Sequence, residues 1–184
     1  NVKAHDDAPK IETKLDDIEV EENTYVYEIK LKTTDIDNKS TQIKHQATSS
    51  NNNIATVEIK NENVLYIRPV KYKHGQVKII VTAVSNGKWV EKDFHLIIKN
   101  KNDAPNGKVT IKFSNQQHRT FVANVDNISD PDGIKGYSYQ WKADNSEIMG
   151  ALQSEFIPTD DEIGKRISVV VTIEDSLGNK SQFI

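Results

Sequence analysis

A short motif that occurs twice limits what this chain can fold into. Asp6-Asp7-Ala8-Pro9 returns 96 positions further on as Asn102-Asp103-Ala104-Pro105. A repeat of this length corresponds to one small domain, and 184 residues leave room for two. We therefore expect two domains in tandem, residues 1–101 and residues 102–184.

Alternating segments between the two copies predict β-strands and not helices. Apolar side chains recur at every second position over most of residues 25–31, 64–67 and 89–98. Residues 76–84 are rich in β-branched side chains, and the turn sequence Ser85-Asn86-Gly87 follows them. We expect this run to form the last hairpin of the first domain with residues 89–98.

The second domain shows the same kind of pattern. Pro158–Gly164 predicts one helical turn, with Thr159 as N-cap and Glu162 three residues later. The chain stops at Ile184, where a last edge strand should run. The fold class is thus all-β, as two tandem antiparallel β-sandwiches, and the strands expected in the second domain are residues 109–113, 121–125, 137–141, 155–157 and 167–173.

Acidic residues gather in the predicted loops at one end of each domain. Consecutive strands of a sandwich run antiparallel, so the start of the first strand and the end of the second lie at the same end. Calcium prefers six to eight oxygen ligands, and carboxylates held close together are most stable when a cation neutralises their charge. We expect Ca²⁺ ligands among Asp7, Asp35 and Asp37 in the first domain and Asn102, Asp103, Asp130 and Asp132 in the second.

Two features of this acidic set stay open. Glu22 is a further candidate ligand, but it precedes a strand and would sit at the opposite end, unless the first strand is short or crosses between sheets. The alternative for every loop is that Asp, Asn and Gly are ordinary turn formers and Asp-Pro-Asp-Gly holds no metal. For Asp175, with Gly178-Asn179, we favour a hairpin turn.

A family resemblance rests on several of these motifs. The repeated motif, Glu22-Asn23-Thr24, Asp35-Ile36-Asp37 and residues 81–87 resemble the cadherin-like or Ig-like repeats of bacterial repeats-in-toxin (RTX) adhesins and biofilm proteins. Residues 128–133, 137–141, 161–165 and 169–172 resemble a sister repeat of the same adhesins. The resemblance implies secretion to the bacterial surface and calcium-stiffened linkers. The family often has Asp at the position of Asn86, so a metal role for that turn is in doubt.

Other functional classes find little support in the residues. The chain has no cysteine, which excludes disulfides and thiolate sites. The histidines are scattered along the chain, which disfavours a zinc site. No catalytic motif occurs, so we do not expect the chain to be an enzyme. Interspersed charges with a net charge of −3 disfavour nucleic acid, and no apolar run could insert in a membrane. The first residues lack an initiator Met and a signal peptide, so we expect the chain to be a piece of a longer protein. We also expect this piece to be monomeric.

The sequence therefore predicts a calcium-rigidified extender or adhesion module that contacts neighbouring repeats of its own chain. One alternative is a module that binds a glycan or a protein, and another is an accessory domain of a secreted hydrolase. Tyr137, Tyr139 and Trp141 share one strand face and could form a carbohydrate platform, but we expect Trp141 in the core. Lys71–His74 is expected to be a solvated face, with an anionic glycan as the alternative.

Overall fold

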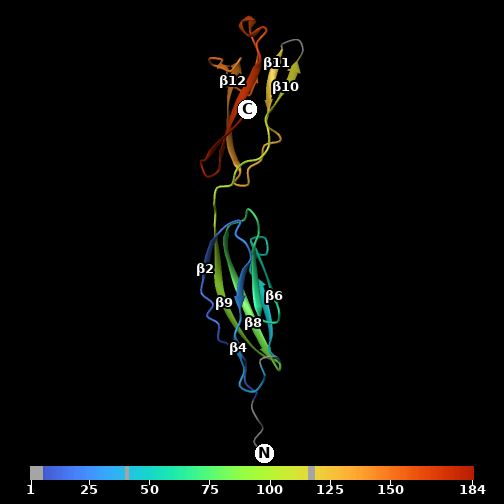
Figure 1. The fold of residues 1–184 in the computed structure, drawn as a ribbon, viewed down its shortest axis with the longest axis vertical. Helices are drawn as coiled ribbons and strands as arrows, with labels where there is room; N and C mark the ends of the chain where they lie inside the picture. The colour runs from blue at the N-terminus through green and yellow to red at the C-terminus, as the bar shows by residue number, and fades with distance from the viewer. Residues whose placement is uncertain (1–5, 40–41, 116–118) are drawn as a thin grey trace, which may run out of the picture. The chain divides into compact units, whose positions relative to one another are not determined.

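The computed structural model describes residues 6–39, 42–115 and 119–184, and it divides the chain into two compact units. Unit 1 is Asn1–Lys101 and unit 2 is Asn102–Ile184. Both units are built of β-strands, and unit 2 also holds a short 3-10 helix (Figure 1). The expected all-β sandwich class is confirmed. Within the described residues, no helix is long and apolar enough to cross a membrane.

The strands of unit 1 form two main sheets and a short two-stranded ribbon. One sheet has the order β2-β9-β8-β5, the other has the order β3-β7-β6, and β1 pairs with β4. The strands are β1 (Lys10–Ile11), β2 (Ile18–Glu21), β3 (Tyr27–Lys30), β4 (Thr33–Thr34), β5 (Lys44–Ser49), β6 (Ala55–Lys60), β7 (Val64–Pro69), β8 (Gly75–Ser85) and β9 (Lys88–Lys99).

The alternation seen in the sequence explains the core of unit 1. Every second residue of β8 is buried, so Val77, Ile79, Val81 and Ala83 face inward, as the predicted period of two requires. Phe94 and the neighbouring inward residues of β9 meet them. The predicted hairpin between β8 and β9 is confirmed, because the two strands pair from Gly75 and Ile98 to Ser85 and Lys88.

One expectation for unit 1 is wrong, and one alternative left open by the sequence is found. The alternation over residues 25–31 places Tyr25 and Tyr27 on the inward face, but they are 91% and 43% exposed, because the strand begins only at Tyr27 and pairs on one side. The first strand is also split. β1 pairs with β4 in the two-stranded ribbon, whereas β2 joins the four-stranded sheet and runs parallel to β9. All other strand pairings among the described residues are antiparallel.

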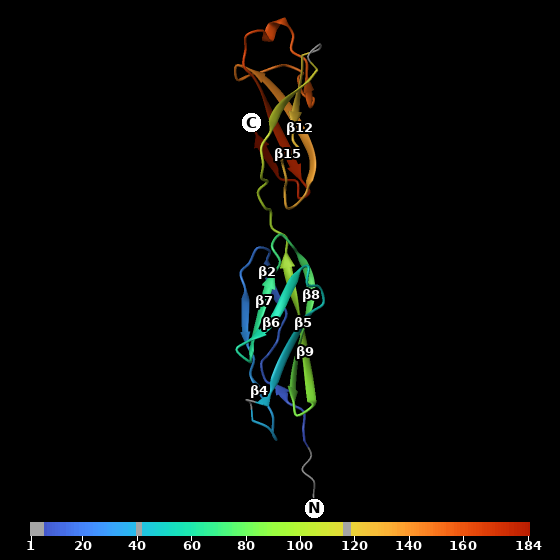
Figure 2. The same cartoon turned by 90° about the vertical axis from the view of Figure 1, so that its right-hand side faces the viewer.

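Unit 2 packs a three-stranded sheet, β10-β11-β14, and a four-stranded sheet, β13-β12-β15-β16, around Trp141 (Figure 2). Trp141 is fully buried and stacks on Phe156 at a centroid distance of 5.4 Å, so the core assignment is confirmed. The elements are β10 (Thr110–Asn115), β11 (Thr120–Asn124), β12 (Ile134–Ala143), β13 (Ser146–Glu147), β14 (Glu155–Phe156), η2 (Asp160–Glu162), β15 (Ile167–Asp175) and β16 (Lys180–Phe183).

The predicted helical turn is the 3-10 helix η2. Thr159 is its N-cap and accepts a hydrogen bond from the N–H of Asp161, and the Glu162 carboxylate accepts from the N–H of Thr159 at 2.8 Å. This reciprocal arrangement is the capping box that the sequence predicted. The expected last edge strand is β16, which pairs with the C-terminal part of β15.

Candidate functional site

The acidic loop of unit 1 brings together segments that lie 30 residues apart. The backbone N–H of Asp7 donates a hydrogen bond of 2.7 Å to Oδ2 of Asp37, and the Asn38 amide donates to Oδ1 of Asp6 at 3.1 Å. The Asp35 carboxylate organises the turn itself, because its Oδ1 accepts from the N–H groups of Asp37 and Asn38 at 2.8 and 3.0 Å. The three predicted ligands Asp7, Asp35 and Asp37 therefore share one end of unit 1.

Unit 2 repeats this arrangement. The N–H of Asp103 donates to Oδ2 of Asp132 at 2.7 Å, and the N–H of Asp132 donates to Oδ1 of Asp130 at 2.9 Å. In both units, the residue before the repeated Ala-Pro meets the second carboxylate of an Asp-x-Asp turn, and the first carboxylate shapes that turn. Two different loop sequences thus produce the same local geometry.

A backbone bridge holds the start of unit 2 against this loop. Asn106 and Ser129 exchange two backbone hydrogen bonds of 2.8 and 2.9 Å, which places residues 103–106 beside the segment that leads to Asp130. Gly107 makes the close approach feasible. It has φ +125°, and a Cβ there would lie 2.0 Å from the carbonyl oxygen of Asn127.

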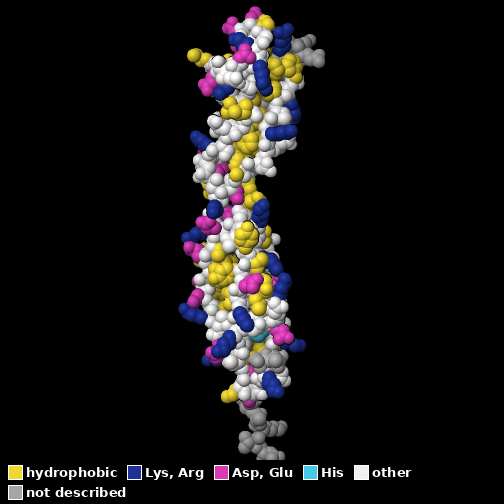
Figure 3. All heavy atoms as spheres, viewed as in Figure 1, with side chains coloured by type: hydrophobic (Ala, Val, Ile, Leu, Met, Phe, Trp, Pro, Cys, Tyr) yellow, Lys and Arg dark blue, Asp and Glu magenta, His cyan; other side chains and the backbone are white. Residues whose placement is uncertain are grey.

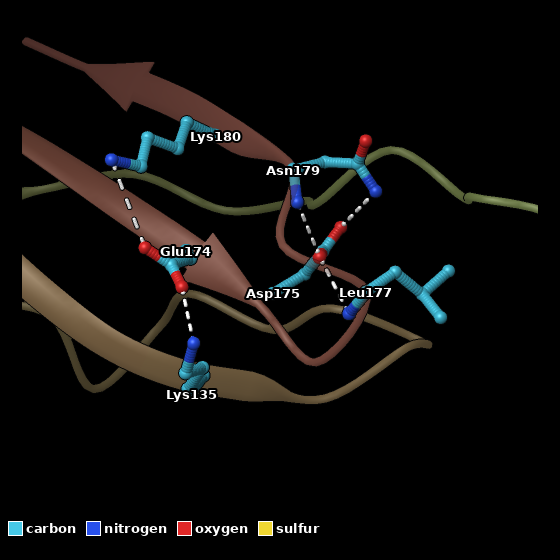
Figure 4. A network of polar contacts seen from close by, with 6 residues as sticks. All are labelled: Lys135, Glu174, Asp175, Leu177, Asn179 and Lys180. Carbon is cyan, nitrogen blue, oxygen red and sulfur yellow. Dashed lines mark hydrogen bonds and ion pairs between the residues drawn. The ribbon is translucent and has the colours of Figure 1, made fainter.

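The hairpin turn after β15 adds a third segment to this end of unit 2. Asp175 is only 3% exposed, and its carboxylate accepts hydrogen bonds from Leu177 N–H and from the backbone and side chain of Asn179 (Figure 4). Asn179 also donates to Oδ1 of the predicted ligand Asn102 at 2.6 Å. The turn favoured for Asp175 is therefore present, and its Asn179 side chain reaches the Asn102 linker position.

Hydrogen bonds from the protein stabilise the ionised form of the Asp175 carboxylate, and its pKa reflects them. Burial raises the pKa, but hydrogen bonds from Asn179 and the N–H groups of Leu177 and Gly178 outweigh burial and hold the pKa below its ordinary value. Beside it, Glu174 forms ion pairs with Lys135 and Lys180 across the sheet (Figure 4).

The Asp35 carboxylate in unit 1 is satisfied on one oxygen and not on the other. Its Oδ2 and the Oγ of Ser85 are both buried, and neither has a hydrogen-bond partner among the described residues. The Ser85 hydroxyl nevertheless lies close enough to be the largest influence that lowers the pKa of Asp35; desolvation opposes it, and the N–H groups of Asp37 and Asn38 add to it. The Ser85 hydroxyl is thus the group beside this buried oxygen, and a cation would add a positive charge there.

Glu22 lies away from the other predicted ligands of unit 1. β2 pairs with the C-terminal end of β9, whereas Asp35 lies near Ser85 at the β8–β9 turn, so the two carboxylates are at opposite ends of β9. Glu22 is 4% exposed, and its Oε1 accepts from the N–H of Lys101 at 2.6 Å. Glu22 thus lies at the opposite end of unit 1 from Asp35, beside the chain segment that leaves the unit, even though the first strand is short and split.

These loops do not form a preassembled metal cage. Across residues 6–39, 42–115 and 119–184, no group of three or more His, Cys, Asp or Glu side chains could hold a metal ion. His45, for example, bonds the hydroxyl of Thr33 and the carbonyl of Glu62, and His5 and His118 lie outside the described residues. Any cation would therefore draw on carboxylates together with amide and backbone oxygens of the loops.

Comparisons with known proteins support the fold. No family model and no curated protein matches the chain. Among solved structures, Drosophila N-cadherin EC1-4 is similar with a TM-score of 0.50 and 12% identity, over 97% of this chain and 48% of that one, so the chain spans about half of that fragment. Ig1-2 of the Drosophila receptor protein tyrosine phosphatase DLAR has a TM-score of 0.38 and 14% identity, over 97% of this chain and 96% of that one. A chimeric titin Z1Z2 has a TM-score of 0.40 and 10% identity, over 98% of this chain and 95% of that one. The likeness to N-cadherin indicates a cadherin-like fold.

Proposed function

We propose that this chain is a calcium-stabilised extender or adhesion module of an extracellular surface protein, in line with its resemblance to bacterial RTX adhesin repeats. The observation that carries the proposal is the repeated geometry in which Asp7 meets Asp37 and Asp103 meets Asp132, each at 2.7 Å. In each unit one carboxylate meets the chain segment that enters the unit, and a cation bound there would stiffen that segment.

In unit 2 the proposed ligands come from two segments. The linker supplies Asn102 and Asp103, and the Asp-x-Asp turn supplies Asp130 and Asp132. When bound, Ca²⁺ would supply a divalent charge that neutralises these carboxylates. The linker residues would then be held against their own loop and lose conformational freedom, which suits a module that must keep its neighbours extended.

In unit 1 the proposed ligands are Asp7, Asp35 and Asp37. The buried Oδ2 of Asp35, which makes no full hydrogen bond with the neighbouring Ser85 hydroxyl, supports a cation there, because a positive charge would stabilise it. The bacterial origin and secretion of the whole protein are part of this proposal, and they rest on the resemblance of the motifs.

Thermal unfolding of the full chain tests the proposal. In about 5 mM CaCl₂, well above the roughly 0.1–1 mM dissociation constants of extracellular calcium modules, the Tm should rise by several degrees over the value in EDTA. The Asp130→Ala/Asp132→Ala variant should lose the part of this calcium-induced rise in Tm that comes from unit 2. Asp160→Ala/Asp161→Ala removes the same charge from an exposed turn and should keep the full response. Equal Tm values in calcium and EDTA would refute the function.

A further inference from the structure

A groove of about 890 Å³ lies in unit 2 at the end of β12 opposite the Asp130–Gly133 loop. Its walls are the β13 edge, the loop of residues 148–153, the β14 edge and the segment around η2. Figure 2 shows this loop and η2 gathered at one end of the unit. None of the proposed calcium ligands lines the groove, so it is a separate feature of the surface.

One buried residue holds the loop wall in place. The backbone N–H of Trp141 donates to the carbonyl of Ala151 at 3.1 Å, and its carbonyl accepts from the N–H of Ile148 at 2.9 Å. The indole N–H donates to the carbonyl of Gln153 at 2.9 Å. Because Trp141 is fully buried, these bonds anchor both ends of the loop to the core of unit 2 and give the groove a fixed shape.

Apolar side chains around this fixed groove point into solvent. Met149 is 99% exposed, Ile157 60% and Leu152 54%, although all three line the groove. Hydrophobic surface is visible at this end of unit 2 in Figure 3. A single exposed apolar residue needs no explanation, but several around one concavity are typical of a binding surface.

The charged residues of the groove are mostly acidic. Glu147, Glu155, Asp161 and Glu162 line it, against Lys165 as the basic lining residue. Bonding to the Thr159 backbone and hydroxyl lowers the pKa of Glu162, so this carboxylate is ionised at neutral pH. The groove therefore complements a ligand that carries positive charge next to apolar groups, and it disfavours an acidic one.

The two sheets of unit 2 both end at this groove. β13 is the edge strand of one sheet and β14 is the edge strand of the other, and each has only two residues. The outer backbone groups of an edge strand can pair with an added strand. In an extended chain, side chains alternate between two faces, so basic and apolar positions can be presented separately.

We propose that this groove binds an extended polypeptide segment in which Lys or Arg alternates with apolar side chains. The apolar side chains of the segment pack on Met149, Leu152 and Ile157, its basic side chains meet Glu147 and Glu155, and its backbone pairs with a sheet edge. This binding needs no calcium and is independent of the function proposed above.

The test uses two labelled heptapeptides on the full chain in EDTA, Val-Lys-Val-Lys-Val-Lys-Val and its counterpart with Glu in place of Lys. Fluorescence anisotropy should show binding of the lysine peptide, with a Kd on the order of 10⁻⁴ M, and at least tenfold weaker binding of the glutamate peptide. Amide shifts in a ¹⁵N spectrum should concentrate at residues 146–157.

Variants separate the groove from general charge attraction. Glu147→Lys/Glu155→Lys should weaken lysine-peptide binding at least tenfold, and Met149→Ser should weaken it several-fold, whereas Glu28→Lys/Glu91→Lys changes the charge of unit 1 equally and should leave the Kd unchanged. The blue-shifted fluorescence of buried Trp141 checks folding. The proposal would be overturned if both double variants weakened binding equally, or if the amide shifts lay outside the groove. It would also be overturned if no peptide bound and the chain instead self-associated in a way that Met149→Ser abolishes.

Discussion

The backbone N–H of Asp103 donates a 2.7 Å hydrogen bond to the carboxylate of Asp132, and the same bond, at the same length, joins Asp7 to Asp37 in unit 1. In each pair, a residue at the entry of a unit is tied to a loop about 30 residues further along. An N–H donor stabilises the carboxylate while leaving its other lone pairs available to a cation. This relationship is the basis of the first prediction.

Replacing Asp132 by Asn should separate the two roles of this carboxylate. The amide oxygen can still accept from Asp103, so the Tm in EDTA should change by only a few degrees, but the loss of charge should remove most of the calcium-induced rise of unit 2. Differential scanning calorimetry in EDTA and in calcium measures both effects. A variant that keeps the full calcium response would show that Asp132 is not a ligand.

Asp35→Asn should behave differently in the absence of calcium. The amide oxygen of the introduced side chain would still accept from the N–H groups of Asp37 and Asn38, while the charge on Oδ2, beside Ser85, would be gone. Because the lowered pKa of Asp35 means that the fold stabilises its ionised form, we expect the variant to be less stable than the original chain in EDTA at neutral pH, and to respond less to calcium. A variant that keeps the full calcium response would show that Asp35 is not a ligand.

Gly107 allows a test of how the linker is held. Gly107→Ala should destabilise unit 2 by about 1–3 kcal/mol more than Gly87→Ala destabilises unit 1, because both have positive φ but only Gly107 faces a backbone within 3 Å. Urea denaturation followed by circular dichroism gives the free energies of unfolding. Equal effects of the two substitutions would mean that the linker can move away from Asn127.

The lowered pKa of Asp175 predicts an acid-dependent stability of unit 2. A carboxyl whose folded pKa lies below its unfolded value of about 3.9 stabilises the fold above that value, and this stability is lost as the pH falls through the folded pKa. Fluorescence of buried Trp141, recorded during urea unfolding between about pH 5 and pH 2, should show the decline. Asp175→Asn should reduce this decline of stability with falling pH. An unchanged decline would exclude Asp175 as its cause.

Much of the fold follows from local pattern in the sequence. The run 76–84 alternates cleanly and ends in Ser85-Asn86-Gly87, so β8, β9 and their turn could be predicted together. The capping box at η2 is likewise a local signal. By contrast, β5 and β6 were not predicted. Lys44–Ser49 has Ala47 as its one apolar residue, so its strand depends on pairing with β8. Ala55–Lys60 does alternate, with Ala55, Val57 and Ile59 on one face, but the run is short and this signal was missed.

The candidate site could be predicted in part for the same reason. The repeated motif and the Asp-x-Asp turns identified Asp7 with Asp37 and Asp103 with Asp132. Asn179 was predicted only as part of the turn after Asp175, and its bond to Asn102 was missed because the two residues are 77 positions apart. The influence of Ser85 on Asp35 was missed for the same reason. Glu22 could not be placed until the switch of the first strand between sheets was known, because no local pattern marks that switch.

The central claim is that calcium binds where these entry segments meet the acidic turns, and an NMR calcium titration of the full chain tests it most directly. We predict saturable shifts of the amide signals of Asp37, Asn38, Asp103 and Asp132, with magnesium producing much weaker ones. Signals of the η2 segment, with its acidic residues Asp160 and Asp161, should not move. If the amides of the two acidic turns stay unchanged up to about 10 mM calcium, well above the affinity range of extracellular calcium modules, the account is wrong.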